Sequence, residues 1–488
     1  MMKFLRSFLL VLVALLPSTV AAQTPQATPP PPAAPRTGAF PQPSERTLPN
    51  GLRVVVVPRA NTPLVAATLL IKNGGEVDPS ELAGLADMTA TLLTKGTTTR
   101  NATQIAQEVE SLGGSLDSEA RFDSSTVSVG VMSSKIGPAM TILADVVRHP
   151  TFTAEEIERQ RQQYMDDITL ALGDPGSIAR FVAARVVFGD SPYGHPISGT
   201  VESLKRITRD DIVKLHERFY RPDNAILVIG GDITPVSGFE LATRYFGDWK
   251  KPETSLPAVS AAMTAKTTNG GRVVVIDKPD AGQAAVYLAR TGINRKDADF
   301  FRGIVTNSVL SGYSGRLNQE IRIKRGLSYG AASTLETRRD VGPFLASAQT
   351  KNESGAEVAS LLMEEISRLV SAPPVDTELT PRKAVLIGNF SRNLETVGGL
   401  VNQVSVLALY GLSLDEINRY ITNVQAITSA DVKSFAGAKL DAETSNIVIV
   451  GNAKVFLPAL EKQFKHVEVI PVDQLDLNTA LLRKKKQP

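Results

Sequence analysis

Cysteine is absent from this chain of 488 residues, and histidine occurs only four times. The absence of cysteine excludes disulfides, thiolate nucleophiles, cysteine-ligated zinc and a lipid-modified cysteine behind a leader peptide. No two histidines are three or four residues apart, so none supplies a helical pair of metal ligands; they are His149, His195, His216 and His466. Serine is common, but neither G-x-S-x-G nor S-x-x-K occurs in a strand–turn–helix context. An independent hydrolase mechanism therefore finds no support.

Long hydrophobic runs are missing beyond the first residues. Lys3 and Arg6 precede the apolar run Phe8 to Leu16, and small residues follow up to Ala22. This order is typical of a cleavable secretory signal, predicted here as residues 1–22. Because no later stretch has the length of an uncharged membrane helix, we expect a protein exported to the periplasm, with no membrane contact after cleavage.

The chain also has little net charge, formally +3 and only about +1 once Lys3 and Arg6 are removed. This net charge is far below the strong positive charge that is typical of nucleic-acid-binding proteins. Residues 471–488 contain the basic run Arg483 to Lys486, which we interpret as a solvated tail.

A proline-rich segment follows the leader, and residues 23–45 are predicted to be a tether because this composition cannot form a core. Folded sequence is expected from about Arg46. The β-branched run Leu52 to Val57 and the run Leu64 to Lys72 predict two strands joined by a short turn.

An internal repeat is the clearest feature of the organisation, because Ile207 to Gly231 recurs in outline as Ile427 to Gly451. Each copy predicts a helix that begins with a capping box and a hydrophobic staple, followed by an apolar strand that ends at glycine. The capping and stapling residues are Thr208, Asp211, Ile207 and Ile212 in the first copy, and Thr428, Asp431, Ile427 and Val432 in the second.

The repeat divides the chain into two tandem homologous α+β domains. We predict an N-terminal domain at 46–249, a linker at 250–270 and a C-terminal domain at 271–470, each a mainly antiparallel sheet packed with helices.

The segment Gly84 to Thr97 resembles the active-site helix of the insulinase/pitrilysin metallopeptidase family, which includes the mitochondrial processing peptidase subunits. In that family the stretch between Gly-Leu-Ala and Lys-Gly-Thr carries H-x-x-E-H, two zinc-binding histidines and a glutamate that activates water. The same three positions here are Asp87, Ala90 and Thr91.

This departure implies that the zinc site is degenerate, because alanine cannot act as a base and threonine is a poor zinc ligand. The resemblance places the family's further glutamate ligand at Asp166 or Asp167. We expect these aspartates to be helix-surface groups, and a weak ion site shared with Asp87 is disfavoured since oxygen-only sites need more ligands. No metal is predicted in this chain.

The second half carries the positive evidence, in Ser311 to Gly330. This segment resembles the family's second-half signature, a glycine-containing turn, a helix and then Arg-Gly-Leu-x-Tyr. The resemblance implies that Arg325 and Tyr329 contact the substrate backbone and the oxyanion near zinc, a role suited to strong hydrogen-bond donors. The alternative is structural, with Arg325 paired to an acid such as Glu320.

The segment Gly113 to Ala120 and the apolar run that follows it resemble the family strand on which an extended peptide adds as a further strand. An ordinary hairpin strand is at least as good an interpretation. The resemblance implies substrate contacts from Ser118, Glu119 and Gly312.

The family resemblance implies a half-clamshell subunit of a heterodimer, in which a partner subunit carries Zn²⁺ and this chain lends Arg325 and Tyr329 to the cleavage of unfolded peptides. The main alternative is a catalytically silent scaffold or peptide-binding subunit of a larger complex. A self-sufficient hydrolase ranks last.

Overall fold

The computed structural model describes residues 42–257 and 271–484. The predicted leader peptide, the tether up to residue 41 and the second part of the linker lie outside the described residues. All of the described residues belong to one compact unit.

The first half contains a six-stranded sheet in the order β1-β2-β6-β3-β5-β4. Every neighbouring pair is antiparallel except β2 and β6, which are parallel. The predicted strands at 52–57 and 64–72 are present, but they do not pair with each other, because β6 lies between them. The strands are β1 (Ser44–Thr47), β2 (Arg53–Pro58), β3 (Leu64–Ile71), β4 (Ser115–Ala120), β5 (Ser125–Met132) and β6 (Ala225–Gly231).

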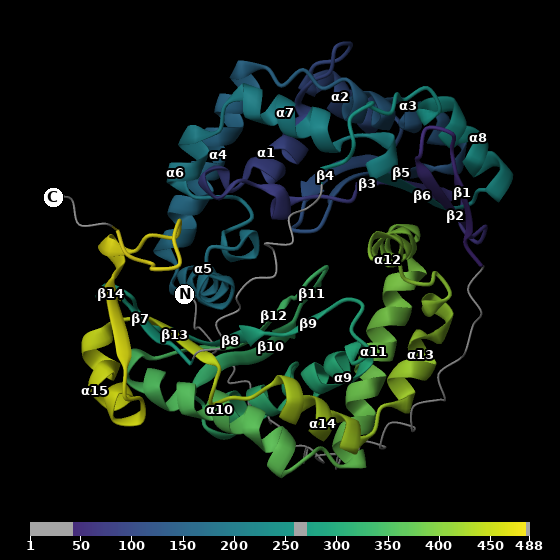
Figure 1. The fold of residues 1–488 in the computed structure, drawn as a ribbon. Helices are drawn as coiled ribbons and strands as arrows, with labels where there is room; N and C mark the ends of the chain where they lie inside the picture. The colour runs from purple at the N-terminus through teal and green to yellow at the C-terminus, as the bar shows by residue number, and fades with distance from the viewer. Residues whose placement is uncertain (1–41, 258–270, 485–488) are drawn as a thin grey trace, which may run out of the picture. The chain divides into compact units, whose positions relative to one another are not determined.

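Helices of the first half cover one face of this sheet (Figure 1). Alternate strand residues such as Val54, Val56, Leu69 and Val129 are buried against them, as expected for strands with a period of two. These helices are α1 (Leu85–Leu92), α2 (Ala102–Ser111), α3 (Ile136–Arg148), α4 (Ala154–Gly173), α6 (Val201–Arg206), α7 (Arg209–Phe219) and α8 (Pro235–Phe246), whereas α5 (Pro175–Phe188) does not belong to this core.

The second half repeats this plan with a six-stranded sheet in the order β10-β12-β8-β13-β7-β14. Its strands are β7 (Val273–Asp277), β8 (Ala284–Thr291), β10 (Ser328–Leu335), β12 (Pro343–Thr350), β13 (Asn446–Gly451) and β14 (Val467–Pro471), and a small separate pair is formed by β9 (Ile293–Asn294) and β11 (Thr337–Arg338). Its helices are α9 (Phe300–Leu310), a π-helical segment (Asn318–Lys324), α10 (Gly355–Ser371), α11 (Asp376–Glu395), α12 (Val397–Leu409), α13 (Glu416–Ala426), α14 (Ser429–Lys439) and α15 (Ala453–Gln463).

The predicted sequence repeat is confirmed in three dimensions. Thr208 and Asp211 form a capping box at the start of α7, and Thr428 and Asp431 form the same box at the start of α14. The strand that follows each helix also takes the equivalent position in its sheet. Strand β6 is parallel to β2 and antiparallel to β3, and in the same way β13 is parallel to β7 and antiparallel to β8. The α+β architecture with two homologous halves is therefore correct.

The two halves exchange a helix, which the sequence did not predict. Helix α12 of the second half packs on the remaining face of the first sheet, where Leu400 and Val404 contact Val55 and Val228. Helix α5 of the first half packs in the same way on the second sheet. Burying an aliphatic side chain stabilises a fold by roughly 1.5–3 kcal/mol, so each half depends on the other for one of its cores.

The segment predicted as a basic tail differs from that prediction up to residue 484. Leu477 and Leu482 are buried in the core that α5 forms with the second sheet. The Ala480 backbone N–H donates to Asp190 (2.7 Å), and the Thr200 hydroxyl donates to Asn478 (2.7 Å). The apolar residues that precede the basic run therefore tie this segment to the first half.

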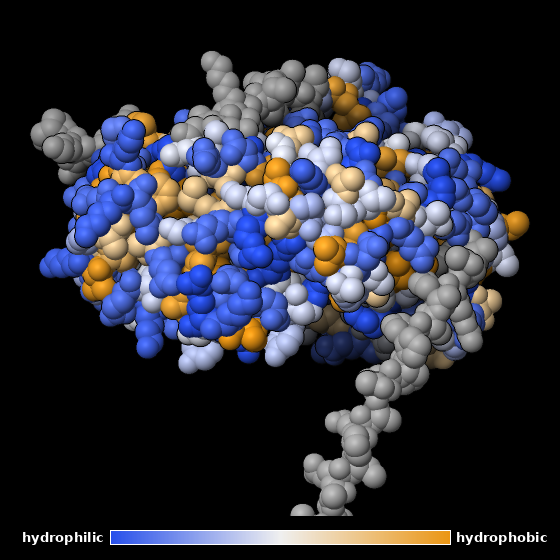
Figure 2. Space-filling view, turned by 90° about the horizontal axis from the view of Figure 1, so that it is seen from below, coloured by the Kyte–Doolittle hydropathy of each residue, from blue (hydrophilic) through white to orange (hydrophobic). Residues whose placement is uncertain are grey.

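Hydrophobic residues lie in small groups among hydrophilic ones on the face shown in Figure 2. This view is from the side of α10 and α14 in Figure 1. An amphipathic helix layer has such a surface when its apolar side faces a sheet. In the described part of the chain, none of the helices combines the length and the apolar composition needed to cross a bilayer.

Candidate functional site

The helix that carries the degenerate motif begins at a strained turn. Gly84 precedes α1 with a φ of 93°, a conformation that favours glycine. The buried carboxylate of Asp78 accepts hydrogen bonds from the backbone N–H groups of Gly84 and Ala86, both at 2.9 Å. This acid stabilises the positive end of α1 and holds Asp87, Ala90 and Thr91 on a fixed frame.

A chain of hydroxyl groups closes the place where the family has zinc ligands. The hydroxyl groups of Thr91 on α1 and Tyr164 on α4 are 2.8 Å apart, and Tyr164 also hydrogen-bonds to the Asp87 carboxylate. A carboxylate only accepts, so Tyr164 donates to Asp87 and Thr91 donates to Tyr164. Burial raises the pKa of Asp87 to about 6, while bonds from Tyr164 and the Ala120 backbone N–H oppose the shift.

The α4 side chain that contacts Thr91 and Asp87 is Tyr164, and the match of Asp166 or Asp167 to the family's further ligand stays a prediction. The carboxylates of these aspartates accept hydrogen bonds from Gln162 and Gln163 of the same helix, at 2.9 and 3.0 Å. Asp167 follows Tyr164 by three residues and therefore lies on the same side of the helix, and both line one cavity, whereas Asp166 is turned by about 200° from Tyr164.

One signal in the sequence could have identified Tyr164. The buried face of α4 carries Ile157 and Ile168, and residue 164 falls on the same face at seven and four residues from them. A count of residues from the motif alone missed this periodicity.

No group of three or more histidine, cysteine, aspartate or glutamate side chains in residues 42–257 and 271–484 could hold a metal ion. The chemistry of the three motif positions and of Tyr164 agrees, since a carboxylate, a methyl group and two hydroxyl groups lack the imidazole ligands that zinc prefers. The residues present therefore do not fit the family's zinc site.

Strand β4 forms an edge of the first sheet and within the described chain pairs only with β5. Its Ser118 hydroxyl donates to the carbonyl oxygen of Ala90 on α1 at 2.6 Å. Glu119 lies on the opposite face, where it pairs with Arg121 and lines a cavity. Of the two predicted contacts, Ser118 thus faces the degenerate helix and Glu119 faces open space.

The cavity has a volume of about 1500 Å³ and takes its walls from both halves. One wall is the face of β3, β4 and β5 that α12 leaves uncovered, with small hydroxyl residues such as Thr126 and Ser128. The facing wall includes Asn389 of α11 and Asn402 of α12, and Gly312, with a φ of 89°, lies at its rim. The lining combines hydroxyl and amide side chains with apolar residues such as Leu345 and Val406 and with charged ones such as Asp117 and Arg180, a mixture that suits an extended peptide.

Arg325 and Tyr329 lie at the start of the second half's edge strand, and neither lines this cavity in the described structure. Arg325 forms ion pairs with Glu320 (3.1 Å) and Glu357 (3.3 Å), as the structural alternative predicted. Tyr329 is 88% exposed. This chain alone does not bring the two residues to its own α1 helix.

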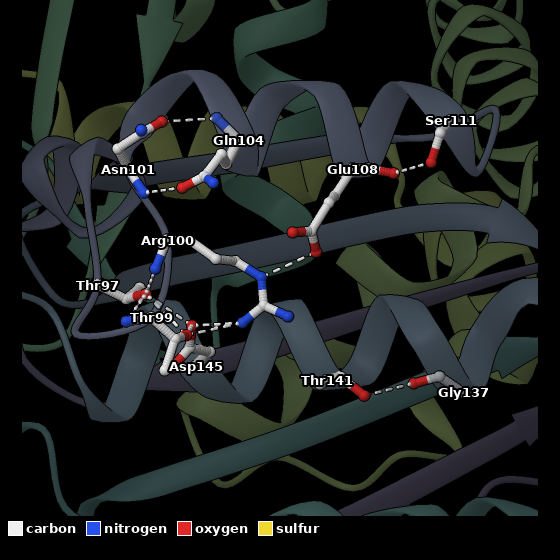
Figure 3. Close-up of polar contacts among 10 residues, drawn as sticks. All are labelled: Thr97, Thr99, Arg100, Asn101, Gln104, Glu108, Ser111, Gly137, Thr141 and Asp145. Atoms are coloured by element: carbon white, nitrogen blue, oxygen red, sulfur yellow. Dashed lines mark hydrogen bonds and ion pairs between the residues drawn. The ribbon is translucent and has the colours of Figure 1, made fainter.

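A buried acid fastens the segment that follows α1. The Asp145 carboxylate of α3 accepts hydrogen bonds from Thr97 (2.7 Å), Thr99 (2.9 Å) and Arg100 (2.7 Å), which gather around it in Figure 3. Arg100 also pairs with Glu108 of α2 at 2.8 Å. Burial raises the pKa of Asp145, but these bonds outweigh it and hold the pKa below its usual value.

Two family models match successive parts of the chain. Residues 53–175 match the family model described as Insulinase (Peptidase family M16), and residues 206–386 match the one described as Peptidase M16 inactive domain. A protein of Mycobacterium leprae named an uncharacterized zinc protease is 26% identical over 394 residues, which are 80% of this chain and 87% of that protein.

Solved structures show the same fold. The peptidase M16 inactive domain from Pseudomonas fluorescens aligns with a TM-score of 0.76 at 24% identity, over 84% of this chain and 98% of that chain. The periplasmic protease PqqL from Escherichia coli aligns with a TM-score of 0.67 at 17% identity, over 89% of this chain but only 51% of that one. Since both halves match models of one family and the fold agrees throughout, this chain belongs to the insulinase, or M16, peptidase family.

Proposed function

We propose that this chain is the zinc-less subunit of a two-subunit M16 peptidase in the periplasm. It binds extended, unfolded peptides and lends Arg325 and Tyr329 to a partner that carries zinc. The observation on which the proposal rests is the hydroxyl chain Thr91–Tyr164–Asp87, which occupies the place of a metal site with groups that cannot form one.

The chemistry of α1 excludes hydrolysis in the manner of the family. Water activation needs a base at the position of Ala90 and a Lewis acid held by imidazoles. Ala90 is fully buried and offers only its carbonyl oxygen, to which Ser118 donates. The helix thus serves as a support for strand β4.

The cavity supports peptide as the ligand class. Its volume of about 1500 Å³ exceeds the 300–1,000 Å³ usual for small-molecule sites. The open edge of β4 offers unpaired backbone groups to an added strand. The floor carries neutral hydroxyl groups on β3 and β5, where Thr68 and Ser128 are 3.1 Å apart, and the carboxylates of Asp117 and Glu119 on β4.

The exposure of Arg325 and Tyr329 supports a role in trans. Both side chains reach solvent on one edge of the molecule, so a partner's substrate can approach them. The ion pairs of Arg325 are solvent-exposed, and such pairs are weak enough to be exchanged for a substrate carbonyl. A guanidinium and a phenol there can stabilise the oxygen that gains charge when water adds.

The match to the Escherichia coli periplasmic protease supports a pair of subunits. This chain covers 51% of that chain, so a second chain of similar size is needed to match its whole length. The leader-like first residues support export to the same compartment.

A silent scaffold is the second candidate, favoured by the ion pairs that hold Arg325 to Glu320 and Glu357. The two proposals separate in a reconstitution experiment with a zinc-bearing M16 chain from the same organism. Cleavage of a quenched, unstructured peptide is measured for each chain alone and for the mixture.

We expect the mixture to cleave faster than the zinc-bearing chain and the lone chain to be inactive with added zinc. Cleavage by the lone chain that a chelator abolishes and zinc restores contradicts the proposal. If the complex is stable and its rate of peptide cleavage is the same with Arg325→Ala and with Tyr329→Phe, the result favours the scaffold hypothesis.

A further inference from the structure

Two consecutive arginines of the second half dock on the turn between β4 and β5 of the first half. Arg338 ends β11, and Arg339 begins the loop that leads to β12. The turn that receives them consists of residues 121–124, which connect the cavity-facing edge strand to its only described partner. The contact therefore joins the second half to the strand pair that forms the cavity floor.

Arg339 makes the larger number of polar contacts. Its guanidinium donates to Glu76 (3.0 Å), to the carbonyl oxygen of Lys72 (2.6 Å) and to the carbonyl oxygen of Asp123 (3.0 Å). Its backbone N–H donates to the Asp123 carboxylate at 2.6 Å. The planar guanidinium suits such a fork of acceptors, whereas an ammonium group does not.

Asp123 collects donors from three separate elements. Besides the Arg339 backbone, its carboxylate accepts from the hydroxyl of Tyr193 (2.5 Å) and from the hydroxyl of Tyr410 at the end of α12 (2.9 Å). Asp123 is 3% exposed. A buried carboxylate with three donors has its hydrogen-bonding capacity well used, and removing a donor is costly.

Arg338 adds a second anchor to the same turn. Its guanidinium carbon lies 4.1 Å from the ring centre of Phe122 and 4.8 Å from that of Tyr193, and Glu336 pairs with it at 2.9 Å. Cation–π contacts of this kind stabilise most when desolvated, and Arg338 is buried.

Strand β4 pairs with β5 on one side along Ser115–Ala120. Its outer edge is open, and α1 holds it through the Ser118 hydroxyl and through the Ala120 backbone bond to Asp87. The turn at 121–124 is thus the point at which the second half can set where the edge strand lies.

We propose that Arg339 is a positioning residue, which through Asp123 and the 121–124 turn lets the second half set the place of the peptide-binding edge of β4. The consequence for peptide binding rests on the proposed function, whereas the placement of β4 does not. If the second half sets the position of β4, the peptide-binding edge depends on both halves and not on the first half alone.

The test uses the full chain and a matched control. Arg339→Ala removes three guanidinium bonds, and Arg53→Ala removes another arginine that crosses between the halves, to the Ala408 carbonyl oxygen at 3.2 Å. The two side chains are equally accessible, 32% and 30% exposed. Tyr410→Phe is the second variant, because it deletes only one donor to Asp123 and keeps the ring.

Two readouts separate positioning from peptide binding. The absence of cysteine allows spin labels at Asp117→Cys on β4 and at Asn402→Cys on α12, whose separation is measured without peptide. Binding of a fluorescent, uncharged and unstructured peptide is measured by anisotropy.

In Arg339→Ala we expect a broader distribution of distances between the two labels and roughly tenfold weaker peptide binding. Tyr410→Phe should change both quantities less, and Arg339→Lys should restore them in part. Arg53→Ala should change neither. Unchanged label separations in folded Arg339→Ala and Tyr410→Phe overturn the positioning role. A wild-type chain that binds no peptide overturns the proposed function and leaves the label measurement as the test of positioning.

Discussion

The hydroxyl group of Tyr164 on α4 lies 2.8 Å from that of Thr91 on α1, two residues separated by 73 positions in the chain. This contact, with the bond from Tyr164 to Asp87, replaces with side-chain hydrogen bonds the link that a metal makes between the two helices in the family. Burial keeps the pKa of Tyr164 above its usual value, so the phenol stays a donor at physiological pH.

The first prediction concerns the strength of this contact. Thr91→Val and Tyr164→Phe each delete one hydroxyl, and each is expected to lower the free energy of unfolding by about 1 kcal/mol. The double variant should lose less than the sum, because either deletion already breaks the bond. Denaturant unfolding of the four proteins measures the coupling, and full additivity contradicts a direct bond.

The second prediction is that three substitutions do not restore a zinc site. Asp87→His, Ala90→Glu and Thr91→His rebuild the helix motif, but the α4 group that contacts positions 87 and 91 is then the phenol of Tyr164. Adding Tyr164→Glu should tighten zinc binding at least roughly tenfold over the triple variant, since a phenol is a poor ligand beside two imidazoles. Competition with a chelating dye measures both affinities. Equal zinc affinities of the triple and the quadruple variant mean that another residue completes the site. Tyr164→Gln in the triple variant is the control for simple removal of the phenol.

Much of the fold could be predicted because local signals repeat. The capping boxes at Thr208 and Thr428 and the strands after them follow from short stretches of sequence. The exchange of α5 and α12 could not be predicted in this way. Both helices are apolar on more than one side, and only the complete structure shows which sheet Leu400 or Ile178 contacts.

Only those residues of the candidate site that lie in a local sequence motif could be predicted. Asp87, Ala90 and Thr91 stand in a motif whose spacing fixes them on one helix. Tyr164, Asp123 and Arg339 belong to no motif, and their contacts join distant segments. The ion pair between Arg325 and Glu320 was foreseen from their closeness in sequence.

The third prediction concerns pH and the Asp145 cluster of Figure 3. The folded pKa of Asp145 lies below its usual value, near 3.9 in an unfolded chain. The carboxylate therefore stabilises the fold fully above about pH 4, and this contribution is lost as the pH falls through the folded pKa. Asp145→Asn should cost about 2 kcal/mol at pH 7 and progressively less below pH 4.

Unfolding by urea between pH 7 and pH 2 checks this prediction. Asp280→Asn is the control, because that carboxylate is 76% exposed and pairs only with Lys278 at 3.0 Å. A cost for Asp145→Asn that stays constant with pH shows that the deficit comes from packing.

The fourth prediction separates catalysis from folding. Arg325→Ala and Tyr329→Phe should each lower the turnover of the reconstituted pair by roughly tenfold or more, with no loss of stability in the lone chain, because both side chains are exposed. Tyr313→Phe, 71% exposed in the same segment, is the matched control and should leave turnover unchanged. A parallel loss in all three variants indicates a weakened subunit contact instead.

Metal analysis of the purified lone chain tests the central claim most directly, namely that α1 has lost its metal site. After incubation with zinc and gel filtration in the presence of a weak chelator, we predict much less than one zinc per chain, with no difference between the wild type, Asp87→Ala and Thr91→Val. One zinc per wild-type chain that disappears in either variant contradicts the account.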